Sequence, residues 1–281
     1  RTGLPTAIWR QMYQGVPASK SVRAQVEDSC GLLEARAEVD CDLVRLNGNE
    51  AAFRLSEAQA FVEAMNQTMA STLFYGDTSV NPERFMGLAP RFSAISGATN
   101  GVNVINGGGS GSDNTSVWLV VWGQNTVHGI FPKGTMAGLE HKDLGEYDAF
   151  DSNNNRYRVV GDMWKWRVGL VVRDWRYVVR VCNIDVSDLI AGTGSQNAQQ
   201  LIKSMVRTFA RIPFRGMGTP VFYANRTVVE NLAIQALDKS QNVLKVEDGI
   251  QQFGQVTPGY TQGSALKLLG VPIRTVDRLL N

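Results

Sequence analysis

The chain has 281 residues, 43% of them hydrophobic and 19% charged, which excludes a disordered or fibrous protein. Its 28 basic and 26 acidic residues leave a net charge of +2 without a run of Lys or Arg, which disfavours a dedicated nucleic-acid-binding protein. Three cysteines without C-x-x-C spacing argue against a disulfide framework and favour a reducing cytoplasm. We expect neither a signal peptide nor a membrane span, because no apolar run approaches the length of about 20 residues that a span needs.

Residues 1–54 lack the pattern of a compact domain. Apolar and polar side chains alternate over 21–27 and again over 33–43, which is the two-residue period of a β-strand. Turn-forming residues at 27–31 separate the two runs, so we predict a long two-stranded hairpin. An isolated hairpin is marginally stable in water. This one must therefore lie either on its own domain or on a neighbouring copy.

A long helix is predicted over 56–74. Ser56 and Gln59 form a capping box at its start, and Gly76 is a suitable C-terminal cap. Apolar side chains recur at every fourth position in between: Phe61, Met65, Met69 and Leu73. A helix of this length, about 30 Å, would be a structural spine. A loop-rich passage punctuated by Gly, Asn and Pro follows over 75–90.

The middle of the chain alternates between Gly-rich loops and strands. Residues 97–116 are rich in Gly, Asn and Ser, and the GGGSGS stretch at 107–112 is expected to be a flexible loop. It is not a phosphate-binding loop, because no Lys follows its last Gly. Short strands are predicted over 117–122 and 126–131, and a polar turn is predicted over 151–155.

The most β-like stretch is 156–184, which is rich in Val, Trp and Tyr. Polar breaks at Gly161-Asp162 and at Arg173-Asp174 interrupt it. We therefore predict two or three antiparallel strands there.

The last third of the chain has the pattern of an α/β layer. An amphipathic helix is predicted over 197–212. Its buried side is expected to carry Leu201, Ile202, Met205, Val206 and Phe209. Its outer side carries the basic residues Lys203, Arg207 and Arg211. A strand over 220–224 leads into a helix capped by Asn225, and a final strand is predicted over 271–276.

No set of residues has the spacing of an active site. His128 and His141 are each isolated from any carboxylate or nucleophile at catalytic spacing, so structural roles are expected. Asp40 and Asp42 are predicted on the exposed face of a strand. The Gly-rich residues 192–195 lead into a helix, but an ordinary capping loop is favoured over an anion site. We predict no catalytic, cofactor-binding or metal site, and no cofactor.

Three segments resemble the major capsid proteins of tailed bacteriophages with the Hong Kong 97-type fold. Residues 75–92, YGDTSVNPERFMGLAPRF, are similar to the segment that follows the spine helix in those proteins. Residues 220–232, PVFYANRTVVENL, resemble the strand-to-helix entry of their axial domain. Residues 270–280, GVPIRTVDRLL, resemble a later strand of the same domain. The segments occur in the family's order, and the podovirus-type branch is the most similar.

The resemblance implies an α+β fold. Its expected parts are an N-terminal arm (1–20), an extended β-hairpin loop (21–54), a mainly peripheral domain (55–213) and a mainly axial α/β domain (214–281). The peripheral domain would hold the spine helix at 56–74 and the long β-strands at 156–184, while part of 93–155 would be axial or an insertion. Altered strand connectivity is expected, because the long strands precede the axial segment here.

The resemblance also implies a structural, non-enzymatic function. Such a subunit self-assembles into pentamers and hexamers of an icosahedral capsid around packaged double-stranded DNA, after synthesis in the bacterial host cytoplasm. Scaffolding, portal and cement proteins are the implied partners, with no membrane partner and only non-specific contact to DNA. The arm and the hairpin loop would reach across a neighbouring subunit. The candidate inter-subunit contacts are Arg23, Glu27, Asp28, Glu34, Arg36, Glu38 and Asp40. The candidate DNA-facing strip is Lys203, Arg207 and Arg211.

Three alternatives stay open. An encapsulin-like nanocompartment shell has the same fold but encloses enzymes. An α/β enzyme with an unrecognised site in 214–281 belongs to a different class, and the absence of a catalytic set weighs against it. A tail or baseplate protein would form rings or tubes.

Overall fold

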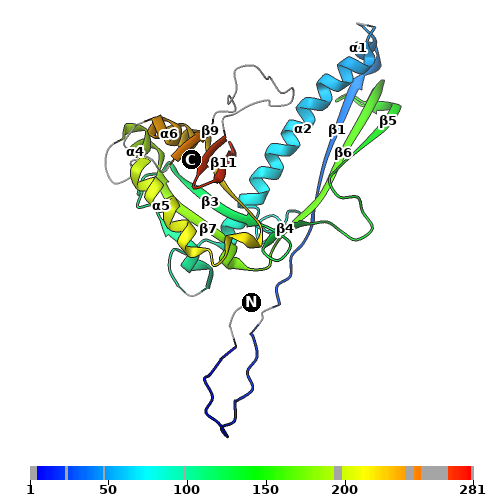
Figure 1. Cartoon of the computed structure of the whole chain (residues 1–281). Helices are drawn as coiled ribbons and strands as arrows, with labels where there is room; N and C mark the ends of the chain where they lie inside the picture. The colour runs from blue at the N-terminus through cyan, green and yellow to red at the C-terminus, as the bar shows by residue number, and fades with distance from the viewer. Residues whose placement is uncertain are drawn as a thin grey trace, which may run out of the picture. The chain divides into compact units, whose positions relative to one another are not determined.

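A computed structural model describes residues 5–22, 25–46, 48–97, 99–192, 198–237, 244–247 and 265–279. The chain divides into two compact units (Figure 1). Unit 1 comprises Arg1–Glu27, Phe92–His128 and Val172–Asn281, and unit 2 comprises Asp28–Arg91 and Gly129–Val171. The predicted limits of arm, hairpin loop, peripheral and axial domains stay predictions.

Unit 1 is built on a mixed β-sheet. Its strands are β2 (Val104–Asn106), β3 (Asn114–Trp122), β7 (Val178–Asp185), β8 (Thr219–Ala224), β9 (Leu244–Glu247), β10 (Ala265–Leu268) and β11 (Val271–Thr275). They pair in the order β2-β7-β3-β8-β11-β10-β9, with the β2–β7 and β8–β11 pairs parallel and the others antiparallel. β4 (Val127–Ile130) adds a single parallel pairing between Val127 and Trp122 of β3. β3 is buried along almost its whole length and apolar from Val117 to Trp122, which fits a strand covered on both faces.

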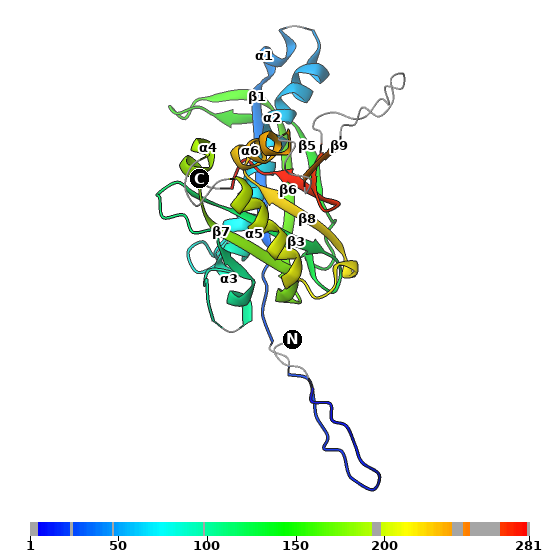
Figure 2. The ribbon, with the colours of Figure 1, turned by 60° about the vertical axis from the view of Figure 1, so that its left-hand side comes forward.

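In the part of unit 1 that the structure describes, the α-helices are α4 (Val186–Ala191), α5 (Ala198–Arg211) and α6 (Arg226–Leu237). α5 packs against β7 and α6, with Leu201, Ile202 and Met205 in the core (Figure 2). The prediction that Val206 is also buried is wrong, since this side chain is 36% exposed. Asn225 caps α6 as predicted, because its Oδ1 accepts a hydrogen bond from the Thr227 amide at 3.0 Å. Short 3-10 helices occur at Thr99–Asn103, Trp175–Tyr177 and Arg215–Met217.

Unit 2 combines one long helix with three antiparallel strands (Figure 1). The strands are β1 (Gly31–Asp40), β5 (Leu139–Phe150) and β6 (Arg156–Val172). β6 is central, because it pairs with β1 over Val159–Val168 and with β5 over Arg156–Trp166. The helices are α1 (Cys41–Arg45), α2 (Glu50–Tyr75) and α3 (Leu88–Arg91).

The predicted hairpin has the wrong partner strand. The strand over 31–40 exists, but it pairs with β6, in register from Gly31↔Val168 to Asp40↔Val159. Residues 25–30 contain no strand. β6 is the better partner because it contributes the indoles of Trp164 and Trp166 to the apolar layer beneath α2, which residues 21–27 cannot match. The alternation of apolar and polar residues over 33–43 runs past the end of the strand at Asp40. Its last residues do not form a strand, since residues 41–45 are helical.

The long helix begins earlier than predicted. α2 starts at Glu50 and not at Ser56, because Asn49 Oδ1 accepts a hydrogen bond from the Ala52 amide at 3.1 Å and caps the helix there. Ser56 therefore lies inside the helix, and the Ser56–Gln59 spacing of a capping box does not mark the start of the helix. The predicted end at Gly76 is confirmed, with the Gly76 amide donating to the Thr72 carbonyl at 2.8 Å.

The strands predicted within 156–184 are not neighbours of one another. β6 pairs with β1 and β5, whereas β7 pairs with β2 and β3. The predicted break at Gly161-Asp162 is also wrong, since β6 continues through it and a bulge between Asp143 and Gly145 of β5 absorbs the irregularity. The break after Val172 and the turn at 151–155 are confirmed.

The Gly-rich stretch at 107–112 is bonded to the sheet and not a free flexible loop. The amides of Gly107 and Gly109 donate to the carbonyls of Cys182 and Asn183, at 2.7 and 2.8 Å. A Cβ on Gly107 would stand 2.7 Å from the Asn183 carbonyl oxygen. These glycines therefore permit a close backbone approach, which composition alone does not distinguish from flexibility.

Candidate inter-subunit surface

The three-stranded sheet of unit 2 has one face packed against α2 and one open face. The packed face centres on Ala37, Met65 and Trp164, with Phe61 stacked on Trp164 at a ring distance of 5.3 Å. Because side chains alternate along a strand, the residues between these apolar positions point to the opposite face. On β1 those residues are Glu34, Arg36 and Glu38. The sequence alternation therefore places a charged row on the open face.

Charges of both signs pair along this open face. Glu34 accepts a hydrogen bond from Arg36 Nε at 2.8 Å and lies 3.4 Å from Lys165 Nζ on β6. The hydrogen bond from Arg36, together with Lys165, holds the pKa of Glu34 below its ordinary value although burial opposes this. Arg167 on β6 donates to Glu140 on β5 at 3.1 Å, which extends the paired charges across all three strands.

Tyr147 crosses the open face from β5 to β1. Its hydroxyl donates to Glu38 at 2.7 Å. Its ring lies against Gly161 of β6, where a Cβ would stand 2.4 Å from Tyr147 Cε1. Burial, reinforced by the carboxylate of Glu38, raises the pKa of Tyr147 to about 12. Gly161 thus leaves the space that this ring occupies.

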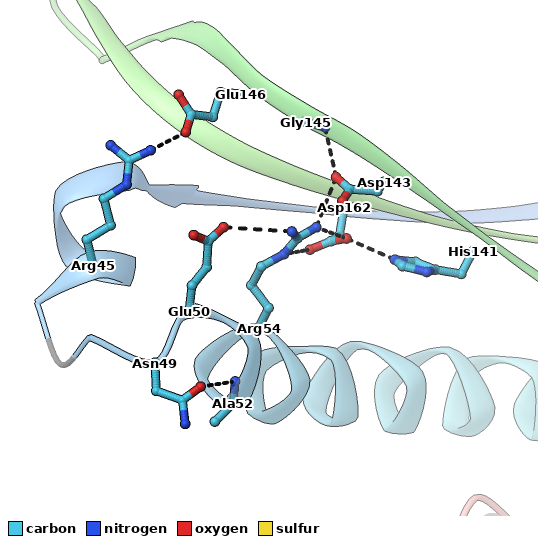
Figure 3. Close-up of polar contacts among 10 residues, drawn as sticks. All are labelled: Arg45, Asn49, Glu50, Ala52, Arg54, His141, Asp143, Gly145, Glu146 and Asp162. Atoms are coloured by element: carbon cyan, nitrogen blue, oxygen red, sulfur yellow. Dashed lines mark hydrogen bonds and ion pairs between the residues drawn. The ribbon is translucent and has the colours of Figure 1, made fainter.

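A polar network ties the start of α2 to the other side of the sheet (Figure 3). Arg54 donates to both carboxylate oxygens of Asp162, from Nε at 3.0 Å and from Nη2 at 2.7 Å. The same Nη2 lies 2.9 Å from Asp143, and Nη1 lies 3.9 Å from Glu50. Burial opposes ionisation of Asp162, but the hydrogen bonds from Arg54 and His141 outweigh it and hold the pKa of Asp162 below its ordinary value.

The prediction that His141 is isolated from any carboxylate is wrong. Its Nε2 lies 2.9 Å from Asp162 Oδ1, and its ring stacks on Trp164 at 5.3 Å. The pairing of β5 with β6 creates this contact, since it places His141 opposite Trp164. Asp162 is held by Arg54 on its other side, so the arrangement fastens helix to sheet and contains no nucleophile. Among the described residues no group of three or more His, Cys, Asp or Glu is placed to hold a metal ion.

The structure places the candidate inter-subunit residues in different settings. Glu34, Arg36 and Glu38 share the open face, as described above. Asp28 forms an ion pair with Arg91 of its own unit at 2.6 Å. Asp40 is not on a strand face with Asp42, because it caps α1 through the Asp42 amide at 2.8 Å. Glu27 is exposed, and Arg23 lies outside the described residues.

The sequence reasoning missed several residues of the same face: Glu140, Tyr147, Lys165 and Arg167. The two-residue spacing of Lys165 and Arg167 places both side chains on one face of β6. It could not assign them to the face of Glu34 and Arg36, because the pairing of β1 with β6 and of β6 with β5 was not predicted.

The candidate DNA-facing strip lies on α5 in unit 1. Lys203 and Arg207 are exposed, one helical turn apart. Arg211 Nη1 donates to the Val104 carbonyl at 3.1 Å and also to the Val102 carbonyl, so this guanidinium is partly engaged within the unit. The sequence contains no Asp or Glu between Asp188 and Glu230, so the strip has no acidic neighbour in its own segment. The stretch 193–195, considered above as an anion site, lies outside the described residues.

The segment that follows α2 is shaped by two glycines in backbone contact. The Gly87 amide donates to the Gly76 carbonyl at 2.8 Å. A Cβ on Gly87 would stand 2.7 Å from the Thr72 carbonyl oxygen, so only glycine fits. Phe85 and Leu88 are buried beside this contact. The Gly-containing pattern over 75–92 therefore has a packing reason.

Comparisons with known proteins give concordant results. The family model described as major capsid protein GP7 matches residues 1–281. A chain in the cryo-electron microscopy structure of bacteriophage Epsilon15 is 35% identical, with a TM-score of 0.65, and the match covers 100% of this chain and 81% of that chain. No curated protein matches. Among the described residues, no helix is long and apolar enough to cross a membrane.

Proposed function

Because the chain belongs to the major capsid protein GP7 family and is a structural, non-enzymatic subunit of a phage shell, we propose that it forms pentamers and hexamers of an icosahedral capsid enclosing packaged double-stranded DNA. The observation that carries the proposal is the family match over the whole chain. It is supported by a mixed α/β fold similar to that of the Epsilon15 chain. The encapsulin-like and enzymatic alternatives are not favoured.

The open face of the β1-β6-β5 sheet is the proposed contact with a neighbouring subunit. It carries Glu34, Arg36, Glu38 and Lys165, so a copy rotated about the shell's symmetry axes can meet it with opposite charges. Single exposed ion pairs contribute only about 0–1 kcal/mol. Weak contacts of this kind, repeated at every interface of a shell, permit reversible assembly and still give a stable particle.

The basic strip on α5 is the proposed contact with packaged DNA. Lys203 and Arg207 are exposed and can neutralise phosphates without reading base sequence. The near-balanced charge of the whole chain, +2, fits a shell that contacts DNA weakly and does not condense it.

Assembly is proposed to take place in the bacterial host cytoplasm with scaffolding and portal proteins, and with a cement protein as a further partner. The cysteines support a reducing compartment, since Cys30, Cys41 and Cys182 are all free thiols.

Electron microscopy of the purified full-length protein, expressed with and without its phage's scaffolding protein, tests the proposal. Closed icosahedral particles are expected. Rings or open tubes would indicate a tail protein, and particles that copurify with enzymes would indicate a nanocompartment. A protein that stays monomeric under all assembly conditions would contradict the proposal.

A further inference from the structure

The outer face of α2 is exposed to solvent and almost free of charge. Over Ala51–Asn66 the exposed side chains are mostly Ala, Ser, Gln and Asn, and only Glu63 among them is charged. Leu55 and Val62 on the same face are 63% and 38% exposed. A helix face that stays in contact with water normally carries charged side chains. This face therefore has the composition of a surface that another element covers.

The exposed residues of this face follow the spacing of a helix-packing seam. Ala52, Leu55, Gln59, Val62 and Asn66 are separated alternately by three and four residues, so they form one row along α2. A second helix packs along such a row by placing its own apolar side chains between those of the first. We call this row the α2 seam, and its spacing indicates that its occupant is an α-helix.

A hollow in unit 2 adjoins the α2 seam. It has a volume of about 400 Å³, and Leu55 belongs both to its wall and to the seam. The other walls, from α2 and from the sheet beneath it, are Ala51, Arg54, Ala58, His141, Asp143, Asp162 and Trp164. A long side chain that reaches past Leu55 would therefore meet apolar surface and carboxylates together.

Negative charge is in excess around this hollow (Figure 3). Arg54 supplies the positive charge, and its guanidinium is shared by the carboxylates of Asp162, Asp143 and Glu50. Asp143 is 55% exposed, and hydrogen bonds from the Gly145 amide and from Arg54 hold its pKa below the ordinary value. Unit 2 as a whole contains 16 acidic and 11 basic residues, a net charge of −5, although the whole chain carries +2. The surface therefore attracts a basic partner and repels nucleic acid.

The helices of this chain that the structure describes do not match this surface. α5 and α6 turn their apolar sides into the core of unit 1, where Leu201, Met205 and Leu232 are buried. The exposed side of α5 is basic, but Val206 is its single exposed large apolar side chain. The α2 seam of a second copy would bring Glu63 against an equally acidic surface. The occupant therefore comes from a separate polypeptide.

We propose that the α2 seam and its adjoining hollow bind a basic amphipathic α-helix of a separate protein that joins the subunit during assembly. The inference rests on the proposed function, in which the scaffolding protein is a partner of this kind. Two large apolar side chains provide a small apolar contact, and the attraction between opposite charges adds to it. A contact of this kind is weak enough to be released when assembly is complete.

Peptide binding to the full-length, unassembled subunit tests the inference. The probe is a fluorescent synthetic peptide of three heptads, with Leu at the two core positions and Lys at the flanking positions of each heptad. Fluorescence anisotropy should show binding. The same peptide with Glu in place of Lys should bind at least tenfold more weakly, because unit 2 is acidic. Equal affinities for the two peptides, or no binding of the Lys peptide, would overturn the inference.

Matched variants test where the peptide binds. Leu55→Lys/Val62→Lys should weaken binding of the Lys peptide at least tenfold. The control Leu43→Lys/Val80→Lys adds the same charge to unit 2 at apolar side chains that are 51% and 73% exposed and lie outside α2, and it should change the affinity less than twofold. Equal losses in the two variants would show that the peptide senses only net charge and would overturn the inference.

Leu55→Ala/Val62→Ala removes the apolar contact without adding charge. Both side chains are exposed, so thermal unfolding of the free subunit should be unchanged, while peptide binding should weaken at least fivefold. In co-expression with the scaffolding protein, the same variant should retain at least fivefold less scaffolding protein in purified particles than the wild type. An unchanged amount would overturn the assignment of the occupant.

The two proposals fail in different ways. Peptide binding is measured on free subunits, so its absence in a protein that still forms closed particles would overturn the inference and leave the shell function standing. A wild-type protein that binds the peptide but never forms particles would contradict the shell function instead.

Discussion

The ring of Tyr147 fills the space that a side chain on Gly161 would need. A Cβ at Gly161 would stand 2.4 Å from Tyr147 Cε1, closer than real Cβ contacts occur. The contact lets the Tyr147 hydroxyl reach Glu38 on the far strand at 2.7 Å. One missing side chain therefore allows a single residue of β5 to bridge the sheet.

Gly161→Ala should destabilise the subunit by about 1–3 kcal/mol, because overpacking forces the ring or the backbone to move. Thermal unfolding of the free subunit measures this. Gly129→Ala is the matched control, since a Cβ there meets its nearest atom at an ordinary 3.8 Å. In a Tyr147→Ala background the cost of Gly161→Ala should largely disappear. A cost that persists would show that the ring is not the obstacle.

Arg54→Met should destabilise the subunit by about 3–5 kcal/mol, because it leaves the buried carboxylate of Asp162 without its cation. Urea unfolding at neutral pH measures the change. The matched control is Arg158→Met, which removes an ion pair to Glu146 from a side chain that is 59% exposed and should cost at most about 1 kcal/mol. Equal effects of the two substitutions would contradict the special role of Arg54.

The Asp162 carboxylate should make stability depend on pH in the acid range. Its pKa in the folded protein lies below the ordinary value of about 4 for an unfolded chain, so its stabilisation is present above that value. The stabilisation is lost as pH falls through the lower pKa of the folded state. Urea unfolding at a series of pH values between 7 and 3 should show a smaller loss for Asp162→Asn than for the wild type. Identical pH profiles would exclude a contribution from this residue.

Reversal of charge on α5 should weaken contact with DNA. The variant Lys203→Glu/Arg207→Glu should bind double-stranded DNA more weakly and reduce the slope of log affinity against log salt by about 2, because two phosphate contacts are lost. Filter binding by assembled capsomers at several salt concentrations measures the slope. The control Lys142→Glu/Arg158→Glu changes the charge equally in unit 2. An equal slope for both variants would show that α5 is not the DNA contact.

The family resemblance depended on short segments whose physical basis is local. Gly76 and Gly87 must be glycine because their backbones touch, and Asn225 must cap the helix that follows β8. Such constraints act within a few residues, so they appear directly in the sequence. The family and the mixed α+β fold predicted from these segments are confirmed.

The pairing of β1 could not be predicted in the same way. Its two-residue period predicts a strand but contains no information about the partner, and β6 lies more than a hundred residues further along the chain. The candidate surface depended on that partner. Without it, Asp28 and Asp40 appeared equivalent to Glu34 and Arg36, although the former two serve contacts inside their own unit.

The amino-acid sequence by itself determined the cores of the longest helices, several of the strands and the end of α2 at Gly76, and which capsid family the chain belongs to, because periodicity, capping and close backbone contacts are local properties. Only the tertiary structure decided which strand β1 joins, that His141 meets Asp162, and that Tyr147 lies over Gly161. These contacts unite residues distant in the chain, and the free energy that selects them comes from burying apolar surface in the folded subunit.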